Sequence, residues 1–170
     1  MPSGDISPDD PSAADVRALL ETHLAFAYSH GPPEDVHALD VDGLLDPAIS
    51  FFSCRENGEL LGIGALNQLD EHHAELKSMH TVATARGKGI GRAMVDHLIN
   101  EARQRNIRRV SLETGTMIAF EPAREMYLRA GFRPCEPFGD YVDSPNSVCM
   151  TLLLENENPA PTDHRTIRPG

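Results

Sequence analysis

The stretch Arg86-Gly87-Lys88-Gly89-Ile90-Gly91-Arg92 places three glycines between the pattern of a strand and the pattern of a helix. A helix N-terminus carries backbone N–H groups without intrahelical acceptors and the positive end of the helix dipole. Glycines remove the side chains that would keep a pyrophosphate away from those N–H groups. The stretch therefore predicts a phosphate-binding loop at the start of a helix.

The spacing of the glycines argues against two common nucleotide-binding loops. A P-loop requires Ser or Thr after its Gly-Lys pair, whereas Lys88 is followed by Gly89. A dinucleotide-binding loop requires a longer step from its second to its third glycine than the step from Gly89 to Gly91. Glu113 ends the next strand near the place of a ribose-binding acid, but antiparallel strands before the loop do not fit a doubly wound sheet. A tight turn that needs glycine only for its backbone geometry remains an alternative.

Outward from the loop, the hydrophobic pattern predicts one domain over residues 11–154. The helix after the loop carries an apolar stripe, formed by Ile90, Met94, Val95, Leu98, Ile99 and Ala102. Because this helix connects a strand at 74–82 to a strand at 109–114, we expect those two strands to be parallel. Further helices are expected between Ser12 and Gly31, at 39–45 and at 120–130, and further strands at 49–55, 60–69, 132–135 and 147–154.

These elements predict a mixed α/β fold. The polar turn Glu56-Asn57-Gly58-Glu59 is a hairpin signal, so the strands on either side of it should be antiparallel. The expected architecture is a mostly antiparallel sheet of about six to seven strands with helices on both faces. Residues 1–10 are expected to form an N-terminal arm, and residues 155–170, which are polar and interrupted by proline, a disordered tail.

Composition limits the partners that such a domain can have. The chain has 170 residues, a hydrophobic fraction of 40% and a formal net charge of −11, which is typical of one globular domain. Its apolar runs are too short for a membrane-spanning helix and its first residues do not form a secretory signal, so we expect a cytoplasmic protein without a membrane partner. The negative charge and an aromatic fraction of 5% argue against a nucleic acid partner.

Neither a metal site nor a disulfide framework is predicted. Cys54, Cys135 and Cys149 are odd in number and form no Cys-x-x-Cys pair. The turn Asp70-Glu71-His72-His73 gathers polar ligands, but adjacent side chains on a turn point apart and no distant third ligand is signalled.

Two motifs resemble the GNAT family of N-acetyltransferases. Arg86-x-x-Gly89-x-Gly91 is similar to the acetyl-CoA loop of that family, and Ala123-x-x-x-Tyr127-x-x-x-Gly131-Phe132 is similar to its later helix and following strand. The stretches 75–79, 112–115 and 137–141 resemble a bacterial subgroup whose substrates are mostly unassigned. The resemblance covers residues 12–154, and it departs at Phe120-Glu121-Pro122, where many members have an Asn that contacts CoA.

This resemblance implies a GNAT-like fold and an enzyme that moves an acetyl group from acetyl-CoA directly to a primary amine of a small molecule or peptide, without a metal. It implies that Glu75 is the general base and that Tyr127 is the general acid that protonates the CoA sulfur. It also implies that backbone amides of the loop hold the pyrophosphate and that the end of the preceding strand pairs with the pantetheine arm. The cofactor-binding residues implied in this way are His80, Thr81, Val82, Arg86, Gly87, Lys88, Gly89, Ile90, Gly91 and Arg92.

Alternatives stay open for several of these residues. From the pattern alone, Glu75 could be a solvated strand carboxylate and Tyr127 a core aromatic. The side chain of His80 either lines the acceptor pocket or has a structural role. A covalent route through Cys135 or Cys149 has no His and orienting acid at recognisable spacing.

The rival functional hypotheses come from other classes of protein. A CoA-binding module that regulates a partner without catalysis is the main alternative. A hydride-transferring dehydrogenase is a distant third. The oligomeric state is left open, with a homodimer as one option.

Overall fold

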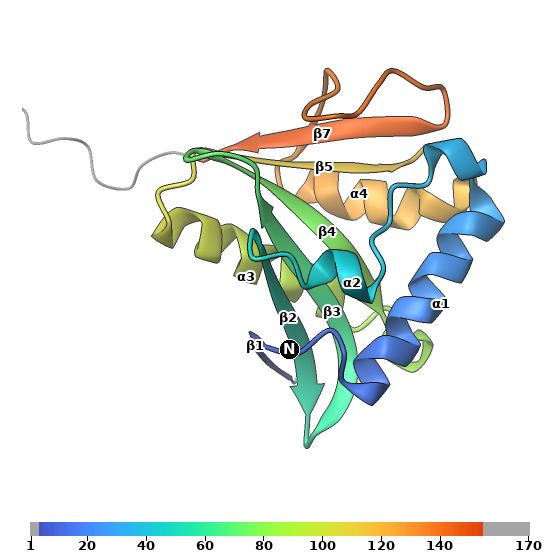
Figure 1. Cartoon of the computed structure of the whole chain (residues 1–170), viewed down its shortest axis with the longest axis vertical. Coiled ribbons are helices and arrows are strands. Elements are labelled where there is room, and N and C mark those ends of the chain that lie inside the picture. The colour runs from blue at the N-terminus through green and yellow to red at the C-terminus, as the bar shows by residue number, and fades with distance from the viewer. Residues whose placement is uncertain (1–3, 155–170) are drawn as a thin grey trace, which may run out of the picture.

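A computed structural model of the chain describes residues 4–154, so the expected tail at 155–170 lies outside the described residues. Its centre is a sheet of seven strands in the order β1-β2-β3-β4-β5-β7-β6 (Figure 1). The strands are β1 (Asp5–Pro8), β2 (Ile49–Glu56), β3 (Glu59–Gln68), β4 (His73–Thr81), β5 (Arg109–Gly115), β6 (Arg133–Cys135) and β7 (Ser147–Leu153). Only the β4–β5 pair is parallel in this sheet, which confirms the mixed, mostly antiparallel prediction.

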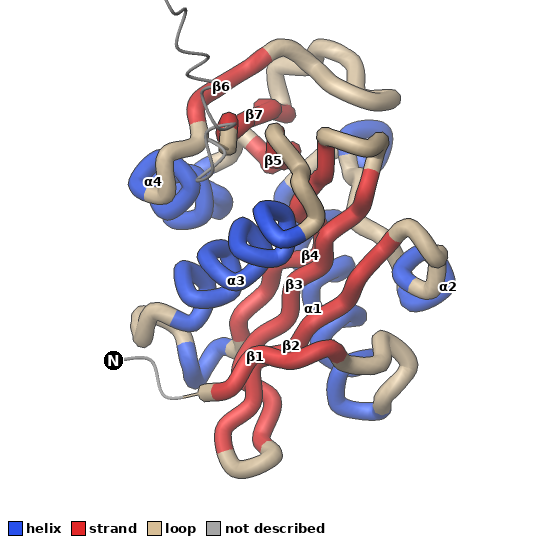
Figure 2. Tube along the Cα trace, turned by 90° about the vertical axis from the view of Figure 1, so that its left-hand side faces the viewer, coloured by secondary structure: helices blue, strands red, loops and turns tan. Residues whose placement is uncertain are grey.

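Helices cover both faces of the sheet, as expected (Figure 2). One face packs against α3 (Ile90–Gln104) and α4 (Glu121–Arg129), and the other against α1 (Ala14–His30) and the short α2 (Val41–Leu44). All six residues of the predicted α3 stripe are buried. Burying a large aliphatic side chain contributes roughly 1.5 to 3 kcal/mol each, so this stripe fixes the helix on the sheet. None of the helices within residues 4–154 is long and apolar enough to cross a membrane.

The hairpin between β2 and β3 forms at the predicted turn. Asn57 has φ 51° and Gly58 has φ 81°, so both central residues are left-handed. A two-residue turn with both residues left-handed matches the right-handed twist of the flanking strands. The hairpin places the apolar residues of β2 and β3 in register on both faces of the sheet.

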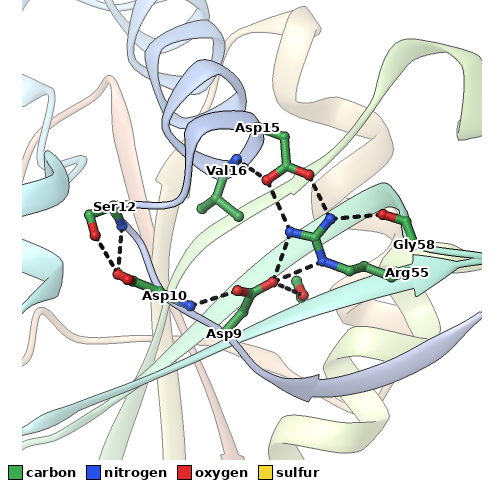
Figure 3. A network of polar contacts seen from close by, with 8 residues as sticks. Asp9, Asp10, Ser12, Asp15, Val16, Arg55 and Gly58 are labelled. Atoms are coloured by element: carbon green, nitrogen blue, oxygen red, sulfur yellow. Dashed lines mark hydrogen bonds and ion pairs between the residues drawn. The ribbon is translucent and has the colours of Figure 1, made fainter.

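The edge of the sheet holds a strand that the sequence did not reveal. Asp5–Pro8, within the expected N-terminal arm, pairs antiparallel with β2 as β1. Arg55 on β2 stabilises this edge (Figure 3): it donates to Asp9, just after β1, at 3.0 Å and to Asp15, in the first turn of α1, at 2.6 Å. It also donates to the carbonyl of Gly58 in the hairpin turn at 3.1 Å. One guanidinium therefore ties the edge strand and the start of α1 to the hairpin.

Strands β4 and β5 pair only over a short length. Their register runs from His73 opposite Arg109 to Glu75 opposite Ser111, and no pairing follows on the C-terminal side of Glu75. Figure 1 shows that the two strands lie side by side at one end and separate toward their C-terminal ends. The parallel neighbours predicted from the connecting helix are confirmed, and their separation opens a wedge in the middle of the sheet.

A β-bulge in β4 changes which side chains face α1. Ile63 of β3 lies opposite His80 and Ala65 opposite Lys77, so two residues of β4 oppose one residue of β3, and Ser78 in the bulge has φ 53°. A bulge of this kind shifts the alternation of side chains by one residue. Simple alternation would put His80 on the face opposite Lys77. The bulge instead places Lys77 and His80 opposite Ala65 and Ile63, which both belong to the core under α1.

Candidate active site

A cavity of about 650 Å³ lies where β4 and β5 separate. One end is lined by the glycine loop and the first turn of α3, and the other by α1 and the segment that follows it. Side chains of α4, including Tyr127, also line it. The cavity therefore joins the predicted phosphate loop to the α1 face of the sheet.

The glycine loop has the geometry of an anion site. Gly87 and Gly89 have φ 75° and 83°, a left-handed conformation that glycine adopts without steric cost. No side chain among residues 4–154 caps α3, and its first intrahelical hydrogen bond runs from the N–H of Ala93 to the carbonyl of Gly89. The N–H groups at the start of the helix therefore precede the intrahelical ladder and are available to a phosphate.

Most of the implied cofactor-binding residues come together at this cavity. Its lining includes His80, Thr81, Arg86, Gly87, Gly89, Ile90, Gly91 and Arg92. Val82 and Lys88 are not part of the lining. The N–H of Val82 donates to the carbonyl of Leu61 at 2.9 Å. The Val82 side chain packs against the hydrophobic core under α3 and against the core under α1.

His80 lies in the cavity wall and also contacts α1. It lines the cavity, and its Nδ1 lies 3.0 Å from Nδ1 of His23 on α1, with the two rings edge to face. Burial lowers the pKa of His23 to about 4, helped by the nearby His80 and Lys77. Burial and Arg86 lower the pKa of His80 to about 4 as well. Both imidazoles are therefore neutral at pH 7 and contribute no charge to the cavity wall.

Tyr127 likewise combines two roles. Its ring is buried on α4 and packs edge to face on Phe132, with the ring centroids 5.8 Å apart. The same side chain lines the cavity. Burial raises the pKa of Tyr127, so its hydroxyl keeps its proton at neutral pH and is able to donate it.

Glu75 is buried and set back from the cavity. Only 4% of it is exposed, so the interpretation as a solvated carboxylate is wrong. It lines a smaller cavity of about 290 Å³ next to the main one. Its carboxylate accepts hydrogen bonds from the amide of Asn67 at 3.3 Å and from the hydroxyl of Tyr141, and it lies 3.8 Å from Nζ of Lys77.

Several polar residues of the main cavity were not identified from the sequence as site residues. Lys77 and Tyr141 line both cavities. Glu113 on β5 lines the main cavity, and its carboxylate accepts a hydrogen bond from the Ser147 hydroxyl at 2.7 Å. Burial raises the pKa of Glu113 despite that hydrogen bond. Tyr141 and Glu113 each belong to a stretch that resembles the bacterial subgroup, and Glu113 was otherwise considered only as the acid of a dinucleotide site.

Phe120 belongs to the stretch Phe120-Glu121-Pro122, where the sequence departs from the family resemblance. It lines the cavity and packs edge to face on Phe26 of α1, with centroids 5.4 Å apart. This part of the wall is therefore apolar. Among residues 4–154, His, Cys, Asp and Glu side chains form no group of three that could hold a metal ion.

Comparisons with known proteins agree with this geometry. A family model described as the acetyltransferase (GNAT) family matches residues 14–132. The uncharacterized N-acetyltransferase YsnE of Bacillus subtilis (strain 168) is 47% identical over 146 residues, covering 86% of this chain and 97% of that protein. The uncharacterized N-acetyltransferase YedL of Escherichia coli (strain K12) is 40% identical over 156 residues, covering 92% of this chain and 98% of that protein.

A solved structure shares the fold. The Bacillus subtilis acetyltransferase crystallised in complex with CoA matches with a TM-score of 0.68 at 17% identity. The match covers 90% of this chain and 100% of that chain. At this identity the likeness is one of fold, and the CoA belongs to that protein.

Proposed function

Because the chain belongs to the acetyltransferase (GNAT) family, we propose that it moves an acetyl group from acetyl-CoA to a primary amine of a small molecule or peptide by direct transfer. The observation that carries this proposal is the continuous cavity from the uncapped start of α3 to the polar side chains on β4. The start of α3 suits a donor that carries phosphates, and the polar side chains on β4 suit an acceptor that carries an ammonium group. The match to an acetyltransferase fold that was crystallised with CoA supports the same assignment.

The donor end fits the pyrophosphate of CoA. The first N–H groups of α3 and the left-handed glycines of the loop provide donors that no side chain shields. From there the wedge between β4 and β5 leads toward Tyr127. The unpaired edge of β4 beyond Glu75 offers backbone groups to the amides of the pantetheine arm.

The transfer itself forms one C–N bond and breaks one C–S bond. Glu75 takes a proton from the acceptor ammonium, and the neutral nitrogen then attacks the carbonyl carbon of the acetyl thioester. The tetrahedral intermediate collapses with loss of the CoA thiolate, to which Tyr127 gives its proton. The second proton that the nitrogen loses restores Tyr127 through solvent. Glu75 releases the first proton to solvent before the next turnover, so both residues end as they began.

The alternative is a CoA-binding module that regulates a partner without catalysis. It needs the donor end of the cavity but not a base near an acceptor site. Glu75 is buried beside Lys77 and Tyr141, which both line the cavity, and this arrangement favours the enzyme.

The decisive experiment measures turnover of acetyl-CoA with a panel of primary amines that includes small amines and short peptides with free N-termini. Release of CoA thiol and a mass gain of one acetyl group on the amine are the expected results. Calorimetry with CoA and with NAD runs in parallel. CoA binding without acetylation of any amine would favour the regulatory module, and absence of CoA binding would overturn the proposal.

A further inference from the structure

Tyr141 lies between the main cavity and the buried carboxylate of Glu75. It comes from the segment between β6 and β7, and its side chain lines both the main cavity and the smaller cavity that holds Glu75. Its hydroxyl donates a hydrogen bond to Oε2 of Glu75. Glu75 itself is not part of the wall of the main cavity, so a group at the acetyl-transfer position meets Tyr141 before it meets Glu75.

We propose that Tyr141 is a further catalytic residue, which relays the proton of the acceptor ammonium to Glu75. This inference rests on the proposed acetyltransferase function. In the relay, an N–H bond of the ammonium breaks and its proton binds the phenol oxygen of Tyr141. At the same time the O–H bond of Tyr141 breaks and that proton binds Oε2 of Glu75. The amine becomes neutral, Glu75 becomes a neutral acid, and Tyr141 ends as it began.

The hydrogen bonds around Tyr141 are arranged for this transfer. Its O–H proton points at Glu75, and its oxygen accepts from Nζ of Lys77 at 2.9 Å. A phenol oxygen has capacity for a further donor, which is the ammonium in the relay. Lys77 is held in place because its Nζ also donates to the carbonyl of His37 at 3.1 Å. A fixed cation beside the oxygen stabilises the negative charge that grows there while the two protons move.

The charged and titratable groups that face Tyr141 come from several elements. They are Glu75 and Lys77 on β4, Glu113 on β5, Cys149 on β7 and His37 from the segment between α1 and α2. Burial raises the pKa of Tyr141, and the carboxylates of Glu75 and Glu113 raise it further. The resting proton therefore stays on Tyr141, and Glu75 is left as the acceptor.

A purely structural role makes a different prediction. The ring of Tyr141 packs edge to face on His37 and on Phe138, with centroids 4.9 and 5.0 Å away. If these contacts were its whole contribution, Tyr141→Phe would keep the ring and retain the activity. The hydroxyl is therefore the group to test.

The test uses Tyr141→Phe, Glu75→Gln and the double variant of the full chain, with the best amine from the panel. We expect each single variant to lower kcat by about 10² or more, the scale of proton-transfer catalysis, with CoA affinity unchanged. The double variant should be no more than about threefold slower than the slower single variant, because both changes break one relay. Both single variants should lose the acidic limb of the pH profile. Tyr28→Phe is the matched control, since Tyr28 is 56% exposed on α1.

Several outcomes would overturn the relay. They are full turnover by Tyr141→Phe, an effect confined to KM, and losses in the two single variants that multiply in the double variant. If the Phe variant does not fold, fluorotyrosine at position 141 keeps the hydroxyl and changes its acidity, and a rate independent of that acidity contradicts the relay. If the unmodified protein acetylates no amine, the proposed function fails and the relay fails with it, whereas an active protein with normal Tyr141→Phe turnover refutes the relay alone.

Discussion

Nδ1 of His23 lies 3.0 Å from Nδ1 of His80, so a hydrogen bond between two imidazole rings joins α1 to β4 at the cavity wall. One ring must donate and the other accept, which excludes a pair in which both rings are protonated. Nε2 of His80 is buried without a partner among the described residues. A tautomer with the proton on Nδ1 of His80 leaves no N–H group unsatisfied there, so we assign His80 as the donor and His23 as the acceptor.

This pair predicts a loss of stability in mild acid. Both pKa values fall from 6.5 to about 4 on folding, so between these values the unfolded chain binds more protons than the folded one. The free energy of unfolding is therefore highest above pH 6.5 as far as these two histidines are concerned. It decreases as the pH falls toward 4, by up to about 1.4 kcal/mol per pH unit for each proton. Urea unfolding at pH 7.5, 6.0 and 5.0 measures it. The double variant His23→Leu/His80→Leu should show a shallower dependence, and an unchanged slope would contradict the assignment.

Substitutions at Gly89 test the phosphate loop. Gly89 is left-handed at the start of α3, and Asn and Asp tolerate that conformation better than other residues. Gly89→Asn and Gly89→Asp have nearly the same shape and differ in charge. The carboxylate would lie beside the pyrophosphate, so the Kd for CoA should be at least about tenfold higher for Asp than for Asn. Calorimetry gives both values, and equal affinities would argue against phosphate binding at this loop.

The fold of both Gly89 variants is the control for that comparison. Asp is a favoured residue at a helix N-cap and its charge suits the positive end of the dipole. The melting temperature of Gly89→Asp without CoA should therefore not lie below that of Gly89→Asn. A lower melting temperature for Gly89→Asp would mean that its loss of CoA affinity comes from damage to the loop.

The hydrogen bonds of Arg55 should contribute to the stability of the sheet edge. Replacement by Met removes its hydrogen bonds to Asp9, Asp15 and Gly58 but keeps most of the aliphatic stem. Because the site is partly solvated, we expect a loss of about 1 to 2 kcal/mol in the free energy of unfolding. Arg129→Met is the control: its ion pair with Glu125 is exposed, and its loss should cost under about 0.5 kcal/mol. Equal losses for both variants would show that the Arg55 network adds nothing specific.

Local pattern was sufficient for most of the fold. The stripe of α3, the Asn57-Gly58 turn and the parallel pairing of β4 with β5 all follow from periodicity and from the length of the connections. Strand β1 was missed because Asp5-Ile6-Ser7-Pro8 has a single large apolar residue and gains its pairing from β2, far along the chain. The bulge at Ser78 was missed because the neighbouring residues alternate well enough to predict a regular strand.

The candidate site was harder to predict than the fold. The glycine loop is contiguous, so phosphate binding could be predicted from its sequence and stays a prediction, whereas the family resemblance is confirmed. Tyr141 and Glu75 come together across 66 positions of sequence, and the pairing of His23 with His80 depends on the shift of side chains caused by the bulge. Contacts of this kind are set by tertiary packing, which no local pattern encodes. The roles of Glu75 and Tyr127 as base and acid stay predictions.

The hydroxyl of Tyr127 is proposed to protonate the departing CoA thiolate. Tyr127→Phe keeps the ring that packs on Phe132, so the melting temperature should change little. Proton donation to the departing thiolate is lost, and kcat should fall by about 10² or more while the affinities for CoA and amine stay close to those of the unmodified protein. Steady-state kinetics with calorimetry of CoA binding separates these quantities.

An activated acetyl donor makes the test of Tyr127 specific to the leaving group. A thioester whose thiol has a lower pKa than CoA departs without protonation, so it should partly restore turnover to Tyr127→Phe. The same donor should not restore Glu75→Gln, because that variant is slow in removing a proton from the amine and not in releasing the thiolate. Equal rescue of both variants would show that Tyr127 does not act on the leaving group. Full turnover of Tyr127→Phe with acetyl-CoA would leave the buried ring with a packing role and assign protonation of the thiolate to solvent or to another side chain of the cavity.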